Sequence, residues 1–221
     1  MRIVTSLFPG VIEIEEDQVF SLVIENKELY LRFLKDMYRQ TLGDGGETIL
    51  SEDDKVINFS AYVEMIMDYV RLEPDSKRLQ GRLCKRLEEE INRGETYPEI
   101  MQILSNLEKV MYQVTECFPF TLSFDGISIP NLMKMVSPKY VDDSSNEVER
   151  VLNYMELCRE MMGERLFVMV GMKSFYSSEG MQNFIDSVVL HKYRVLLIDS
   201  SESDILKNER RMLIDNDICV I

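Results

Sequence analysis

The last third of the chain alternates short apolar segments with amphipathic helical segments. Leu166–Val170 and Arg194–Ile198 are almost wholly apolar, which is typical of strands covered on both faces in a parallel sheet. The sequence predicts helices at residues 147–162, 177–190 and 206–213, and a closing strand at 218–221. Because parallel strands joined through helices take right-handed crossovers, this order predicts an α/β fold with a largely parallel sheet and flanking helices.

The N-terminal part carries further strand patterns. It predicts strands at 11–14 and 19–24, a helix at 27–42, a hairpin formed by 48–50 and 55–59, and a helix at 60–70. Asn26 is a typical N-cap residue for the first of these helices. The N-terminal strands also need a covered apolar face, so we expect them to join the parallel sheet.

The middle of the chain has a different character. It predicts helices from 74 to 117 with a break near 94–98, a short strand at 120–124, and a helix at 130–135. Two helices joined by a short loop form a hairpin, which can protrude from a compact body. We therefore predict an α/β head domain, residues 1–60 with 138–221, and a protruding α-helical leg domain, residues 61–137.

Charge constrains the partners of this chain. It has 25 Lys and Arg against 39 Asp and Glu, for a formal net charge of -14 over 221 residues. Hydrophobic residues make up 45% of the sequence, which is enough for a core and excludes disorder as the main state. The acidic balance opposes binding to nucleic acid or anionic lipid unless cations gather on one surface.

Cysteine and histidine usage excludes a zinc site of the usual spacing. The cysteines, at positions 84, 117, 158 and 219, form no C-x-x-C pair, and His191 is the single histidine. We expect reduced thiols. The start of the chain turns acidic after a short apolar stretch, so we expect no signal peptide. Apolar runs are too short to span a bilayer, and we predict a cytoplasmic protein without a membrane partner.

One segment looks like the end of a phosphate-binding loop. Gly171-Met172-Lys173-Ser174 follows a predicted buried strand, and Asp199 ends the next one. A working P-loop requires G-x-x-x-x-G-K-[ST], whereas Met172 separates the glycine from the lysine and the first glycine is missing. The segment therefore favours a degenerate P-loop-ATPase-like scaffold over an active nucleotide hydrolase.

The most informative pattern is basic. In the first middle helix, five cations fall within about 100° of arc at 100° per residue: Arg78, Arg82, Lys85, Arg86 and Arg93. Such a stripe suits contact with a phosphate backbone, because it matches charge without reading bases. The alternative is a solvated helix face, since Glu88, Glu89 and Glu90 lie nearby.

Several short segments together resemble a known family. They are Val23–Asn26, Gly45-Gly46 with Ile49–Lys55, Leu122–Gly126, Leu166–Val170, Arg194–Asp199 and the tail Ile214–Ile221. In order and spacing, over essentially the whole chain, they resemble the short form of the Csn2 family, the CRISPR-associated adaptation proteins of type II-A systems.

This resemblance implies a function. Members of the family have an α/β head and a helical leg, and they form ring-shaped homotetramers whose central hole takes double-stranded DNA. They bind calcium near the junction of head and leg, and they act with the adaptation integrase proteins and the effector nuclease during spacer acquisition. The fold has no catalytic activity attributed to it, so we expect a non-enzymatic, sequence-independent DNA-binding protein.

The basic stripe and the chemistry of calcium ligands suggest which residues would serve this function. For DNA contact we expect Lys77, Arg78, Arg82, Lys85 and Arg86, with Lys134 and Lys139 near the junction. For calcium, which needs several oxygen ligands, we expect Glu116, Asp125, Asp142 and Asp143. These acids could instead serve as turn and capping residues. Two other functions stay open: an acidic scaffold that recruits the integrase and nuclease and, less favoured, a nucleotide hydrolase.

Overall fold

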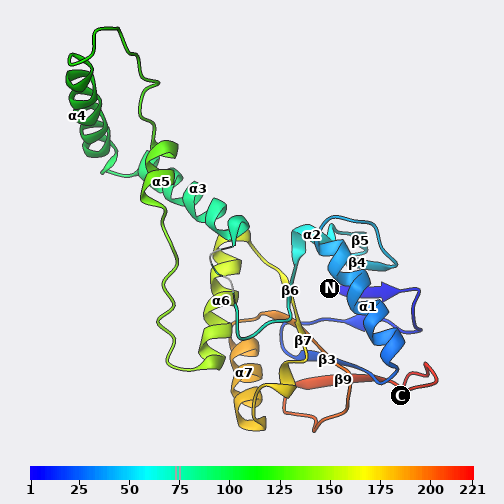
Figure 1. The fold of residues 1–221 in the computed structure, drawn as a ribbon. Helices are drawn as coiled ribbons and strands as arrows, with labels where there is room; N and C mark the ends of the chain where they lie inside the picture. The colour runs from blue at the N-terminus through cyan, green and yellow to red at the C-terminus, as the bar shows by residue number, and fades with distance from the viewer. Residues whose placement is uncertain (73, 75) are drawn as a thin grey trace. The chain divides into compact units, whose positions relative to one another are not determined.

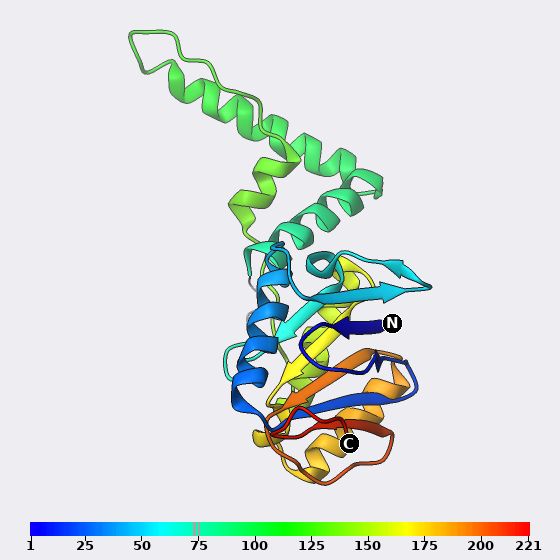
Figure 2. The same cartoon turned by 90° about the vertical axis from the view of Figure 1, so that its right-hand side faces the viewer.

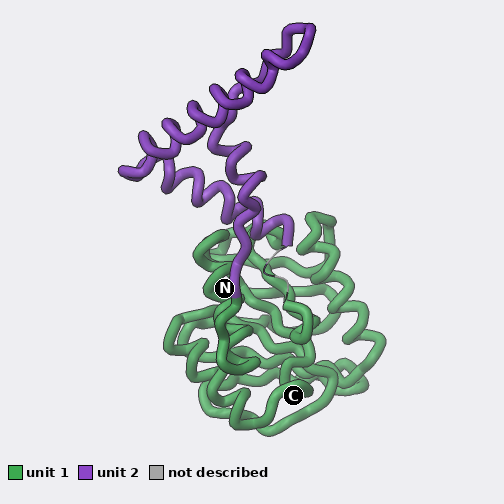
Figure 3. Tube along the Cα trace, turned by 60° about the vertical axis from the view of Figure 1, so that its left-hand side comes forward, with its two compact units in different colours: residues 1–72, 142–221 green, residues 73–141 purple. Residues whose placement is uncertain are grey.

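The chain folds into two compact units (Figure 3). The computed structural model describes residues 1–72, 74 and 76–221. Unit 1 consists of residues 1–72 and 142–221, and unit 2 of residues 73–141. The sequence placed these limits at 60/61 and 137/138. Residues 61–72 fall in unit 1 because they include a strand of its main sheet.

A five-stranded sheet forms the centre of unit 1. Its order is β6 (Val63–Ile66), β7 (Leu166–Val170), β8 (Arg194–Asp199), β3 (Val19–Ile24) and β9 (Glu209–Ile214). Every neighbouring pair is parallel. The prediction of an α/β fold with a largely parallel sheet is thus confirmed.

Helices cover both faces of this sheet (Figures 1 and 2). Helix α1 (Lys27–Thr41) begins at Asn26, whose side chain accepts a hydrogen bond from the Leu29 N–H at 3.0 Å. Its buried side chains, among them Phe33 and Met37, join Phe20 and Leu22 of β3 in one apolar core. Helices α6 (Glu147–Met162) and α7 (Ser178–Leu190) lie on the other side of the sheet.

A second sheet completes the core on the α1 side. It is antiparallel, in the order β2 (Ile12–Glu13), β1 (Arg2–Thr5), β4 (Thr48–Glu52) and β5 (Lys55–Val56). The predicted hairpin of β4 and β5 is therefore present. Of the predicted N-terminal strands, β3 joins the parallel sheet, whereas β2 pairs with β1 in this second sheet.

Two predicted helices are wrong. In place of a helix at 60–70, the chain forms one short turn of helix, α2 (Phe59–Tyr62), and then strand β6. In place of a helix at 206–213, it forms β9 along the edge of the sheet. Both segments border the sheet, where pairing with one neighbouring strand outweighs a weak local preference for helix.

Two predicted strands are also not formed as predicted. Residues 120–124 form no strand, and the chain end at 218–221 makes only an isolated bridge from Val220 to Ile214. After β7, residues 172–174 form a short 3-10 turn (η1, Met172–Ser174).

Unit 2 is helical, as predicted. It contains α3 (Lys77–Arg93), α4 (Tyr97–Thr115) and α5 (Ile129–Val136). Position 75, within the predicted helical stretch that starts at Pro74, lies outside the described residues. In the part of the chain that the structure describes, no helix combines the length and apolar character needed to cross a bilayer.

Candidate nucleic-acid interface

Helix α3 separates an apolar face from a basic one. The Ser76 hydroxyl caps the helix by accepting a hydrogen bond from the Leu79 N–H at 3.4 Å. Leu79 is buried, and Leu83, Leu87 and Ile91 are half-buried, where α3 packs against α4 and α5. Because helical side chains three or four positions apart share a face, this packing leaves the basic stripe in solvent.

The five candidate DNA contacts on α3 are all exposed: Lys77, Arg78, Arg82, Lys85 and Arg86. Arg86 forms an ion pair with Glu90 one turn later, at 3.2 Å. An exposed pair of this kind contributes little to stability and is easily exchanged for a phosphate. The structure thus exposes all five cations to solvent along one helix.

Most of the negative net charge belongs to the unit that does not contain α3. Unit 1 carries 16 Lys and Arg against 29 Asp and Glu, a net of -13. Unit 2 carries nine against ten, a net of -1. Helix α3 itself has six basic and three acidic residues, a net of +3. The acidic balance of the chain therefore belongs to unit 1, while α3 is locally basic.

The remaining basic candidates lie in or beyond α5. Lys134 is exposed in the last turn of this helix, and Lys139 is exposed just after it. Since α5 packs against α3, Lys134 belongs to the same helical unit as the stripe. Lys139 belongs to the same unit as the stripe.

The acidic candidates for calcium do not form a ligand set. Glu116 follows α4 and Asp125 lies in the loop after it, both exposed in unit 2, whereas Asp142 and Asp143 belong to unit 1. Among the described residues, no group of three or more His, Cys, Asp or Glu could hold a metal ion. The calcium site thus stays a prediction from the resemblance, with two of its four candidate residues in each unit.

Asp142 instead has a local structural role. Its carboxylate accepts a hydrogen bond from the Ser144 N–H at 3.1 Å and pairs with Arg150 at 3.4 Å. Hydrogen bonding from Ser144, helped by the nearby Arg150, lowers the pKa of this carboxyl. These contacts are those of a turn residue just before α6.

The segment that resembles a P-loop is closed by an ion pair. The Lys173 Nζ lies 2.5 Å from the Glu209 Oε1 of β9, and both side chains are buried. The P-loop-like detail of the fold prediction is not confirmed, because Lys173 lies within a 3-10 turn and its ammonium group is already paired with Glu209. Sequence reasoning missed Glu209 and Arg211, since it placed them in a helix.

The comparisons with known proteins agree with this architecture. The sequence model described as CRISPR-associated protein (Cas_Csn2) matches residues 40–218. The crystal structure of Stu0660 of Streptococcus thermophilus is similar to the chain with a TM-score of 0.61 and 15% identity, covering 91% of this chain and 69% of that one. No curated protein sequence matches. At that identity the structural likeness concerns the fold, while the sequence match spans most of the chain, which therefore belongs to the Csn2 family of CRISPR-associated proteins.

Proposed function

We propose that this protein is a non-enzymatic, sequence-independent double-stranded DNA-binding protein that supports CRISPR type II-A spacer acquisition. The observation that carries the proposal is the exposed basic face of α3, with a net charge of +3 in a chain of -14. A row of cations along one helix neutralises successive phosphates and makes no demand on base sequence.

The test exchanges cations for acids at two exposed positions. Arg82 and Lys85 form no ion pair with the described residues, so Arg82→Glu with Lys85→Glu leaves the packing of α3 intact. We expect weaker binding to a blunt linear duplex of mixed sequence. The slope of log K against log salt should flatten by about 1.8, since each phosphate contact contributes about 0.9.

A matched control separates local from total charge. Lys27→Glu with Lys35→Glu changes two exposed cations of α1 and lowers the net charge by the same amount. It should reduce the affinity far less and leave the salt slope unchanged. If both double variants lost affinity equally, overall repulsion would explain the effect and α3 would not be the contact surface.

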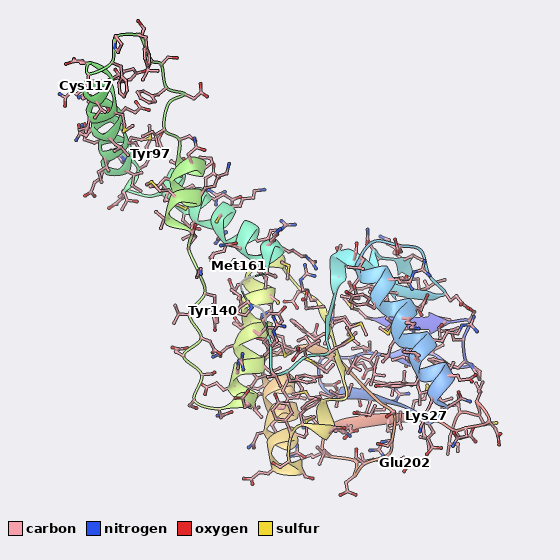
Figure 4. All side chains as sticks on the ribbon, viewed as in Figure 1. Lys27, Tyr97, Cys117, Tyr140, Met161 and Glu202 are labelled. Atoms are coloured by element: carbon pink, nitrogen blue, oxygen red, sulfur yellow. The ribbon has the colours of Figure 1, made fainter. Side chains whose placement is uncertain are left out.

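Helix α4 supports self-association, as expected for a ring-shaped homotetramer. Its exposed apolar residues recur at alternating spacings of four and three: Ile103, Leu107, Val110 and Val114. Three of these four side chains are more than half exposed. This spacing is the a/d seam of a coiled coil, whose burial needs a second helix. The helix runs from Tyr97 almost to Cys117 (Figure 4). We propose that the α4 seam pairs with α4 of another copy.

The proposal also includes a calcium dependence. It rests on the family resemblance alone, because the described acids bring no ligand set together. Solution mass by light scattering in calcium and in a calcium chelator tests it. We expect a tetramer in calcium and smaller species in the chelator, and an identical mass in both would remove calcium from the proposal.

A second function is favoured by the charge of unit 1. Its net of -13 suits basic partners, such as the adaptation integrase proteins and the effector nuclease. In this scaffold function DNA contact would be secondary. Association with those proteins that survives nuclease treatment and the Arg82→Glu/Lys85→Glu change would favour the scaffold over DNA binding.

A further inference from the structure

A cluster of charged side chains is buried at one face of the parallel sheet, on the side of α6 and α7. In the register of the sheet, Ser21 of β3 pairs with Arg211 of β9, and Val23 pairs with Asp199 of β8. Side chains alternate along a strand, so Ser21, Asp199, Glu209 and Arg211 point to the same face. Phe20 and Leu22 point to the opposite face, into the core that contains α1.

The buried carboxylate of Glu209 faces two cations and one backbone N–H. Its Oε1 lies 2.5 Å from Lys173 Nζ and 3.7 Å from Arg211 Nη2, and its Oε2 accepts the Leu206 N–H at 2.9 Å. The three charged side chains are no more than 10% exposed. One lysine, one arginine and one backbone N–H form the set of donors that proteins use to hold phosphate.

The same cluster contains polar atoms with unused hydrogen-bonding capacity. Ser21 Oγ, Asp199 Oδ2 and Arg211 Nε are buried and have no partner among the described residues. Buried polar groups are normally satisfied by protein or by bound water. The cluster therefore offers more donors and acceptors than its internal contacts use.

The loop between β8 and β9, residues 200–208, lies over this cluster as a strap. The guanidinium of Arg211 donates to the Ser203 carbonyl, and Glu209 holds the Leu206 N–H. The amide of Gln182 on α7 binds Lys207 twice, accepting from its N–H at 3.0 Å and donating to its carbonyl at 3.3 Å. Glu202 marks the strap in Figure 4. The residues that would hold an anion thus also hold the strap.

We propose that Lys173, Arg211 and the Leu206 N–H form a latent phosphate-binding site, which the Glu209 carboxylate fills as an internal ligand. The contact is autoinhibitory: the donors face Glu209, and the strap closes over them. This site lies in unit 1, and it does not depend on the proposed DNA contact at α3 in unit 2. Inorganic phosphate is the probe, because it carries the charge and the acceptor oxygens that the donors recognise.

The test removes the internal ligand. Glu209→Ala deletes both the charge and the volume of the carboxylate, and it leaves room for an anion beside Lys173 and Arg211. We expect the thermal midpoint of this variant to rise saturably with phosphate at constant ionic strength, with an apparent affinity at least tenfold above that of the wild type. Adding Lys173→Gln to Glu209→Ala should abolish the response.

The matched control is Glu47→Ala, which also removes one acid from an ion pair, that of Glu47 with Arg32 at 2.7 Å, but on an exposed surface. It should respond to phosphate as the wild type does. Equal responses of Glu209→Ala, Glu47→Ala and wild type would overturn the proposal. If Glu209→Ala does not fold in chloride, it should fold in phosphate of equal ionic strength, as judged by circular dichroism. Failure to fold in both would equally overturn it.

Discussion

Asp199 is predicted to lower the stability of unit 1 at neutral pH. Burial at the end of β8 raises the pKa of its carboxyl from 3.8 to about 6, with Glu209 adding to this rise and Lys173 and Arg211 opposing it. Its Oδ2 has no hydrogen-bond partner among the described residues. Asp199→Asn removes the ionisation while keeping the size and shape of the side chain.

The magnitude follows from the difference between the two pKa values. The folded state binds the proton more tightly than the unfolded state, so stability falls as the pH rises from about 4 through 6. The full difference amounts to about 3 kcal/mol, at about 1.4 kcal/mol for each pKa unit. Between pH 5 and pH 8 the wild type should lose about 1.4 kcal/mol through this group.

Urea unfolding at fixed protein concentration measures the effect. The signals are far-UV circular dichroism and tyrosine fluorescence, since the chain has ten tyrosines and no tryptophan. Asp199→Asn should be more stable than the wild type at pH 8 by up to about 3 kcal/mol, and this advantage should shrink by about 1.4 kcal/mol at pH 5. Measurements should stay above the pI of about 4.6 to preserve solubility.

The exposed Asp143→Asn, which removes the same charge from the surface, serves as the control against which the pH dependence of Asp199→Asn is compared. A pH-independent difference for Asp199→Asn would refute the reasoning. So would a variant that is less stable than the wild type at pH 8, because the carboxylate would then contribute more through Lys173 and Arg211 than its burial costs.

Two further predictions concern assembly and chemistry. Val110→Asp, in the exposed seam of α4, should reduce the solution mass measured by light scattering, because a buried carboxylate opposes helix pairing; Ser105→Asp, also exposed on α4 but away from the seam, should leave the mass unchanged. Phosphate release from ATP should stay at background for both the wild type and Lys173→Met, because the Lys173 ammonium group already forms an ion pair with Glu209. Release above background that Lys173→Met removed would instead identify a nucleotide hydrolase.

The central strands were predictable, while the edge strands were not. β3, β7 and β8 are apolar on both faces because they are covered on both sides, and the sequence alone shows it. β6 and β9 mix charged and apolar residues, as edge strands do, and their composition is also compatible with helix. Only pairing with β7 or β3, far away in sequence, decides their structure.

The basic stripe of α3 and the buried charged cluster of unit 1 also differ in whether the sequence could predict them. The α3 stripe was predictable, because five residues of one helix share a face through local geometry alone. The buried cluster was not, because Lys173 and Glu209 are 36 residues apart and meet only when β9 takes its place in the sheet. A sequence pattern can predict contacts within one element, and contacts between elements follow from topology.

Self-association through the apolar seam of α4 would raise the number of phosphate contacts that the basic stripes of α3 can make. One α3 offers five exposed candidates, in a chain whose other unit repels DNA with a net of -13. So few contacts give weak binding at physiological salt, whereas several stripes joined in one assembly bind the same duplex at high effective concentration. Self-association through α4 would thus supply the affinity that a single stripe lacks. It follows that Val110→Asp, which changes no residue of α3, should weaken DNA binding as strongly as the loss of Arg82 and Lys85.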